Sequence, residues 1–102
     1  EEGNFEGKKQ FIEKCDAAMA EFLDLPDDVL LVVTADHSTA CELHAHTADP
    51  VPILFCSPHV RIDDVQEFGE RAFVRGGLGR MEGKDIMPTV LNVMGRLHLI
   101  GA

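Results

Sequence analysis

The chain has 102 residues, with 18 acidic against 9 basic side chains and a net charge of −9 at pH 7. This length suits one small domain, and the acidic balance excludes a nucleic-acid partner or an anionic membrane surface, because both select basic patches. No apolar run approaches the roughly 20 residues of a membrane span, and the charged N-terminal stretch shows no signal peptide. We therefore expect a cytoplasmic protein.

The cysteines Cys15, Cys41 and Cys56 stand at wide spacings and form no CxxC pair. An odd number of this kind favours reduced, buried thiols over a disulfide framework. Cys41 lies within a histidine-rich stretch, where it is an alternative soft metal ligand.

The first half of the chain predicts a helix followed by a strand. Over residues 5–24, apolar side chains recur at intervals of three and four, which is typical of an amphipathic helix. Pro26 ends this helix. Residues 29–35, VLLVVTA, are apolar on both faces and predict a strand inside a parallel sheet.

A second strand and a short helix are expected next. Residues 51–57, VPILFCS, predict another buried strand with prolines at its start, where a missing N–H does least harm. Asp63 or Asp64 is expected to cap a short helix that runs through Phe68.

The last part of the chain predicts a loop and a helix. Residues 75–83 are rich in glycine and lack the spacing of a phosphate-binding P-loop, so a plain connection is expected. From Lys84 onward the pattern is helical, with Asp85 as a cap, Pro88 in the first turn and Gly95 as the stop.

This order of elements predicts the α/β class. Two strands that are apolar on both faces need neighbouring strands and covering helices, which so short a chain does not supply. We therefore expect residues 1–102 to form a single segment, the C-terminal part of a larger domain with a mostly parallel sheet flanked by helices.

Candidate metal ligands follow the first predicted strand. Asp36 and His37 stand at its carboxyl end, where ligands bind in open α/β sheets, and His44 and His46 come soon after. Neighbouring side chains of extended backbone point to opposite sides, so we expect Asp36 and His37 to serve two different ions. Two-metal sites commonly act on phosphate esters. His46 can return to one ion across a loop at 38–45, expected to be mobile, but spacing does not separate it from His44.

The types of donor atom limit the choice of metal ion, but they do not exclude an interpretation without a metal. A mixed imidazole and carboxylate set suits Zn, Mn or Mg in hydrolytic chemistry. In the alternative interpretation, Asp36 caps a turn and His37 only packs. His59 and His98 are expected on the surface, and neither Ser38 nor Ser57 follows a nucleophile-elbow motif.

Three strings of the chain carry a resemblance to one enzyme family. The metal-binding segment of archaeal-type cofactor-independent (2,3-bisphosphoglycerate-independent) phosphoglycerate mutases, in the alkaline phosphatase superfamily, resembles TADHSTACELHAHTADPVPILF. The family's preceding helix resembles GNFEGKKQFIEKCDAAM, and its C-terminal end resembles GGLGRMEGKDIMPTVLNVMG. The resemblance thus extends over nearly the whole chain.

The resemblance implies an alkaline-phosphatase-like domain that holds two divalent metal ions (Mn, Mg, Co or Zn). A nucleophilic Ser would carry the phosphoryl group between 2-phosphoglycerate and 3-phosphoglycerate. Asp36 and His37 match the family's Asp-His pair for one ion, and His46 matches the His of the other. His44 and Thr47 would then support the site or act as further possible ligands.

The chain also departs from the family pattern. Ala40 replaces a common Pro, and Glu1 or Glu2 falls where the family has a His ligand. The nucleophilic Ser and two Asp ligands would lie upstream of residue 1, so the chain alone is expected to be inactive. A phosphatase or phosphodiesterase of the same superfamily, and a non-catalytic metal- or partner-binding domain, remain alternatives.

Overall fold

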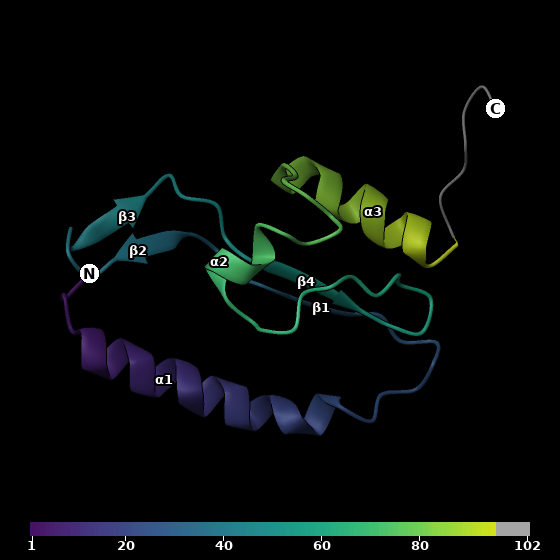
Figure 1. Cartoon of the computed structure of the whole chain (residues 1–102), viewed down its shortest axis with the longest axis horizontal. Helices are drawn as coiled ribbons and strands as arrows, with labels where there is room; N and C mark the ends of the chain where they lie inside the picture. Colours follow the sequence, from purple (N-terminus) through teal and green to yellow (C-terminus); the bar gives the residue numbers. More distant parts are fainter. Residues whose placement is uncertain (96–102) are drawn as a thin grey trace.

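The structure is a computed structural model that describes residues 1–95. Helices and strands are mixed along the chain, as predicted for an α/β protein (Figure 1). The elements are α1 (Phe5–Ala18), η1 (Met19–Phe22), β1 (Leu31–Thr34), β2 (Ser38–Ala40), β3 (Ala45–Thr47), β4 (Ile53–Cys56), α2 (Glu70–Phe73), η2 (Gly83–Asp85) and α3 (Ile86–Val93), where η marks a 3₁₀ turn.

The first helix forms where the apolar spacing predicts it. α1 begins after Asn4, whose side-chain oxygen accepts a hydrogen bond from the Gly7 N–H at 2.9 Å. It continues through η1 to Phe22, close to the predicted end. Its apolar stripe is uncovered, since Phe11 and Ile12 are 67% and 56% exposed.

The predicted parallel sheet is not supported. β1 and β4 form where two buried strands are expected, but they pair antiparallel, with Val32 opposite Phe55. Parallel neighbours need a long crossover, usually a helix. Here the connection contains a hairpin instead, so the chain returns beside β1 in the opposite direction (Figure 1).

That hairpin replaces the loop expected at 38–45. β2 and β3 pair antiparallel, with Thr39 directly opposite His46. The turn between them contains His44 in the left-handed region, at φ 52°, a conformation that His adopts more readily than most residues. The hairpin extends from the β1–β4 pair toward the N-terminus (Figure 1).

The prediction of a short helix that runs through Phe68 is wrong. Helix α2 begins only at Glu70. The Asp63 carboxylate instead accepts hydrogen bonds from the backbone N–H of Val65 at 3.0 Å and of Gly77 at 2.8 Å. The first of these bonds forms an Asx turn, which competes with a helical start.

The C-terminal elements follow the prediction closely. The Gly-rich stretch is largely irregular, α3 contains Pro88 in its first turn, and Gly95 ends the helix at φ 69°. Asp85 differs in detail, because its carboxylate accepts from the Glu82 N–H at 3.3 Å in a capping box of η2. It therefore caps the turn before α3 rather than α3 itself.

The core is small. Among residues 1–95, only Phe55 and Ala72 are buried hydrophobic residues. The radius of gyration is 15.8 Å, against about 13 Å for a compact domain of 100 residues. In the described part of the chain, none of the helices has the length and apolarity that a membrane crossing requires.

The prediction of buried thiols is wrong. Cys15 and Cys56 are exposed and Cys41 is half-buried. Cys15 lies on α1 and Cys56 at the end of β4. His59 is exposed, as predicted, whereas His98 lies outside the described residues.

Candidate metal centre

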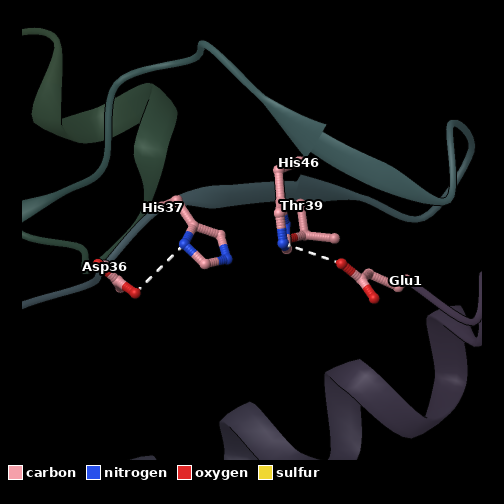
Figure 2. A network of polar contacts seen from close by, with 5 residues as sticks. All are labelled: Glu1, Asp36, His37, Thr39 and His46. Carbon is pink, nitrogen blue, oxygen red and sulfur yellow. Dashed lines mark hydrogen bonds and ion pairs between the residues drawn. The ribbon is translucent and has the colours of Figure 1, made fainter.

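The fold brings two of the predicted ligands together. His37 immediately precedes β2, and His46 lies in the middle of β3. Because the hairpin folds back on itself, the two imidazole rings lie 3.9 Å apart between centroids, with their planes tilted by 57° (Figure 2). Both side chains are about half exposed, at 47% and 52%.

Asp36 lies beside His37 rather than opposite it. Its Oδ2 is 3.3 Å from His37 Nδ1, so the prediction that the two side chains point to opposite sides is wrong. The alternation of side chains holds only in extended backbone, and the chain bends at Asp36, between β1 and β2. The bend allows the carboxylate and the imidazole to act on one ion.

His46 is held at both ring nitrogens. Its Nδ1 lies 2.8 Å from the Thr39 hydroxyl, across the strand pair. Its Nε2 lies 2.9 Å from Oε1 of Glu1, at the start of the chain (Figure 2). The orientation of the His46 ring is therefore set by Thr39 on the hairpin and by Glu1 in the residues before α1.

The other two candidates make different contacts. The His44 ring lies against Gly3, where a β-carbon would come within 2.3 Å of it. The Thr47 hydroxyl donates to Asp49 Oδ2 at 2.6 Å, near the exit of the hairpin. The Thr47 contact stabilises the exit of the hairpin, and the His44 contact joins the hairpin to the residues before α1.

The donors form two pairs: Asp36 with His37, and Glu1 with His46. Within residues 1–95, no group of three or more His, Cys, Asp or Glu side chains is arranged to hold a metal ion. Imidazole nitrogens and carboxylate oxygens on an open surface nevertheless fit the chemistry of a divalent ion. Each pair supplies part of a coordination shell.

An open pocket of about 620 Å³ lies beside the second pair. Glu1, Thr39, Cys41 and His46 are among the residues that line it. The half-buried Cys41 thus lies near His46, and the alternative of a soft ligand stays a prediction.

Reasoning from the spacing of residues missed Thr39. Its role depends on the pairing of β2 with β3, and two three-residue polar strands carry no alternation strong enough to predict that pairing. The available signal was the pair Thr39 in DHST and His46 in HAHT. These two residues are seven positions apart and flank a four-residue turn.

Residues 1–93 match the metalloenzyme superfamily. The chain belongs to this superfamily. Its polar donor pairs thus occur in a family named for metal-dependent enzymes.

Curated relatives point to one enzyme. Two proteins named 2,3-bisphosphoglycerate-independent phosphoglycerate mutase, from Methanosphaera stadtmanae and Methanothermobacter thermautotrophicus, are 45% and 44% identical over 101 residues. These matches cover 99% of this chain and 24% of each relative. The chain thus spans about a quarter of the length of the curated relatives it matches.

A solved structure shares the fold. A protein of Pyrococcus horikoshii superposes with a TM-score of 0.90 at 41% sequence identity, over 99% of this chain and 27% of that one. The arrangement of helices, β1–β4 pair and hairpin is therefore also found within a larger protein.

Proposed function

We propose that residues 1–102 contribute part of the two-metal site of a cofactor-independent phosphoglycerate mutase, an isomerase that interconverts 2-phosphoglycerate and 3-phosphoglycerate. The observation that carries the proposal is the convergence of His37 and His46, 3.9 Å apart between ring centroids. It occurs in a chain 44–45% identical to archaeal relatives that carry this name. The phosphoryl group would be carried by a serine outside this chain.

The chain's own residues would divide into two ligand groups. Asp36 and His37, held 3.3 Å apart at the bend after β1, would bind one ion, and His46 would bind the other. Bound Mn, Mg, Co or Zn would neutralise phosphate oxygens and lower the pKa of an attacking hydroxyl. Thr39 would orient the His46 ring, and the hairpin would keep the two imidazoles adjacent.

The charge of the chain supports the need for metal. A phosphorylated substrate is an anion, and this chain carries a net charge of −9. Asp36 is itself a proposed ligand and Glu1 lies beside His46, so these carboxylates would repel a phosphate in the absence of metal ions. Two divalent cations would supply the local positive charge that the protein lacks.

The exposed apolar surface supports membership of a larger domain. Phe11 and Ile12 on α1 are more than half exposed, and monomeric proteins rarely leave such stripes uncovered. We place residues 1–102 as one segment of an alkaline-phosphatase-like domain. Further strands would pair with the outer edges of β1 and β4, which among the strands within residues 1–95 pair only with each other.

The experiment is an isomerase assay on the full-length enzyme, without 2,3-bisphosphoglycerate. We expect interconversion of 2- and 3-phosphoglycerate that chelation abolishes and added Mn²⁺ restores, whereas the purified 102-residue chain stays inactive. Release of inorganic phosphate without isomerisation would indicate the phosphatase alternative. Metal binding without either reaction would indicate a non-catalytic domain.

A further inference from the structure

We propose that Lys8 binds an anionic oxygen of the phosphorylated substrate while that substrate is held at the metal site. The inference rests on the proposed function and adds a substrate-binding residue to it. Lys8 lies near the start of α1, beside the hairpin (Figure 1). Its Nζ donates a hydrogen bond to the Thr39 carbonyl at 2.6 Å, which joins α1 to β2.

Lys8 is the basic side chain of the pocket beside His46. Among residues 1–95, no other lysine or arginine lines this pocket of about 620 Å³. Glu1 and Glu2 line it as well, and the whole chain carries a net charge of −9. An anion that enters the pocket therefore depends on Lys8 and on bound metal ions for attraction.

The charge of Lys8 is available to a ligand. A lysine ammonium carries three N–H donors, and the Thr39 carbonyl, which is neutral, uses one of them. None of the ion pairs within residues 1–95 includes Lys8. The next residue differs, since Lys9 Nζ lies 3.2 Å from Glu13 Oε1. The bond to Thr39 thus holds the Lys8 ammonium in place without neutralising it.

Thr39 connects the ammonium to a proposed metal ligand. Its carbonyl accepts from Lys8, and its hydroxyl lies 2.8 Å from Nδ1 of His46. A substrate held by the metal ions would therefore have Lys8 close by. Phosphoglycerate carries a phosphate and a carboxylate, and an ammonium forms charge-assisted hydrogen bonds with the oxygens of either group.

The test titrates inorganic phosphate and glycerate, in separate experiments, into the full-length enzyme at saturating Mn²⁺, and also measures KM for 3-phosphoglycerate. Lys8→Met keeps the apolar stem and removes the charge. It should weaken binding of at least one anion by about tenfold or more and raise KM by a similar factor, because hydrogen bonds to charged groups are among the strong ones. Weaker binding of phosphate alone identifies the phosphoryl group as the partner, and weaker binding of glycerate alone identifies the carboxylate.

Two further variants serve as controls. Lys9→Met removes the same charge one residue away, from a side chain that is paired with Glu13, and it should change anion binding less than about twofold. Lys8→Arg keeps the charge and should recover most of the anion affinity that Lys8→Met loses. Equal weakening by Lys8→Met and Lys9→Met would overturn the inference, because a general charge effect would explain both.

The remaining outcomes separate this inference from the proposed function. Unchanged binding of both anions in Lys8→Met would overturn the role of Lys8 and leave the metal site standing. Loss of bound Mn²⁺ without weaker anion binding at saturating Mn²⁺ would also overturn it, because Lys8 would then only hold the Thr39 carbonyl. Anion binding that depends on Lys8, in an enzyme that does not interconvert 2- and 3-phosphoglycerate, would overturn the proposed function and support the anion site.

Discussion

Two exposed carboxylates of the molecule, Asp63 and Glu1, have partners of different kinds. Asp63, between β4 and α2, accepts hydrogen bonds from the backbone N–H groups of Val65 and Gly77 at 3.0 and 2.8 Å. Glu1, beside the hairpin, faces the imidazole of His46 at 2.9 Å. Both carboxylates are exposed. The first is committed to the backbone, whereas the second faces a side chain that can also bind an ion.

Because both carboxylates are exposed, their roles are indicated by the groups that they contact, and not by residue type or exposure. The Gly77 N–H bond, with the Val65 bond second, lowers the pKa of Asp63 below its ordinary value of 3.8. Such a carboxylate holds a loop in place. A carboxylate opposite an imidazole, on the wall of a pocket, is suited to hold a cation.

The largest expected effect distinguishes the two neighbouring histidines. In the full-length enzyme, His46→Ala should lower isomerase activity by at least about 1,000-fold, because losing a metal removes more than the 10²–10³ of a single electrostatic contact. His44→Asn is the matched control, since Asn tolerates the left-handed φ of 52° at this position. It should keep most of the activity and bound metal, as measured by assay and metal analysis. Equal losses of activity and metal in the two variants would contradict the assignment of His46, rather than His44, as the ligand.

A smaller effect is expected at Thr39. Thr39→Val keeps the shape but removes the hydroxyl that holds His46 Nδ1, so Mn²⁺ affinity should fall by about tenfold. Thr39→Ser restores the hydroxyl and should recover most of the affinity. Isothermal titration of both variants measures this. Failure of Thr39→Ser to recover the affinity that Thr39→Val loses would show that the Thr39 hydroxyl does not position the His46 ring.

The smallest effect concerns Asp63 and pH. Because the folded-state pKa is lowered, the stability from this carboxylate is present above its unfolded value and is lost as pH falls below about 3.8. Asp63→Asn should therefore lower Tm slightly at pH 7, and this difference in Tm should shrink as pH falls from about 3.8 through the lowered folded-state pKa, as measured by circular dichroism. Asp64→Asn removes the same charge and should leave Tm at pH 7 unchanged. If Asp63→Asn changes Tm by the same amount at every pH, the charge of Asp63 does not contribute to stability.

Much of the local structure was predictable. Periodic apolar residues identify α1 and the helix around Val90, and short continuous runs of apolar residues identify β1 and β4. The concentration of Asp36, His37, His44 and His46 in eleven residues predicts the position of the candidate site, but spacing alone does not separate His44 from His46. These features are local, because spacing along a helix or strand depends only on neighbouring residues.

The way in which these helices and strands pack together depends on the tertiary structure. The antiparallel direction of β4 depends on a connection that folds as a hairpin, and the bend at Asp36 sets its side chain beside His37. Contacts between Thr39, His46 and Glu1 join three separate parts of the chain. Hydrogen bonds between distant residues require the backbone to be folded first, so no pattern within a short stretch of sequence determines them.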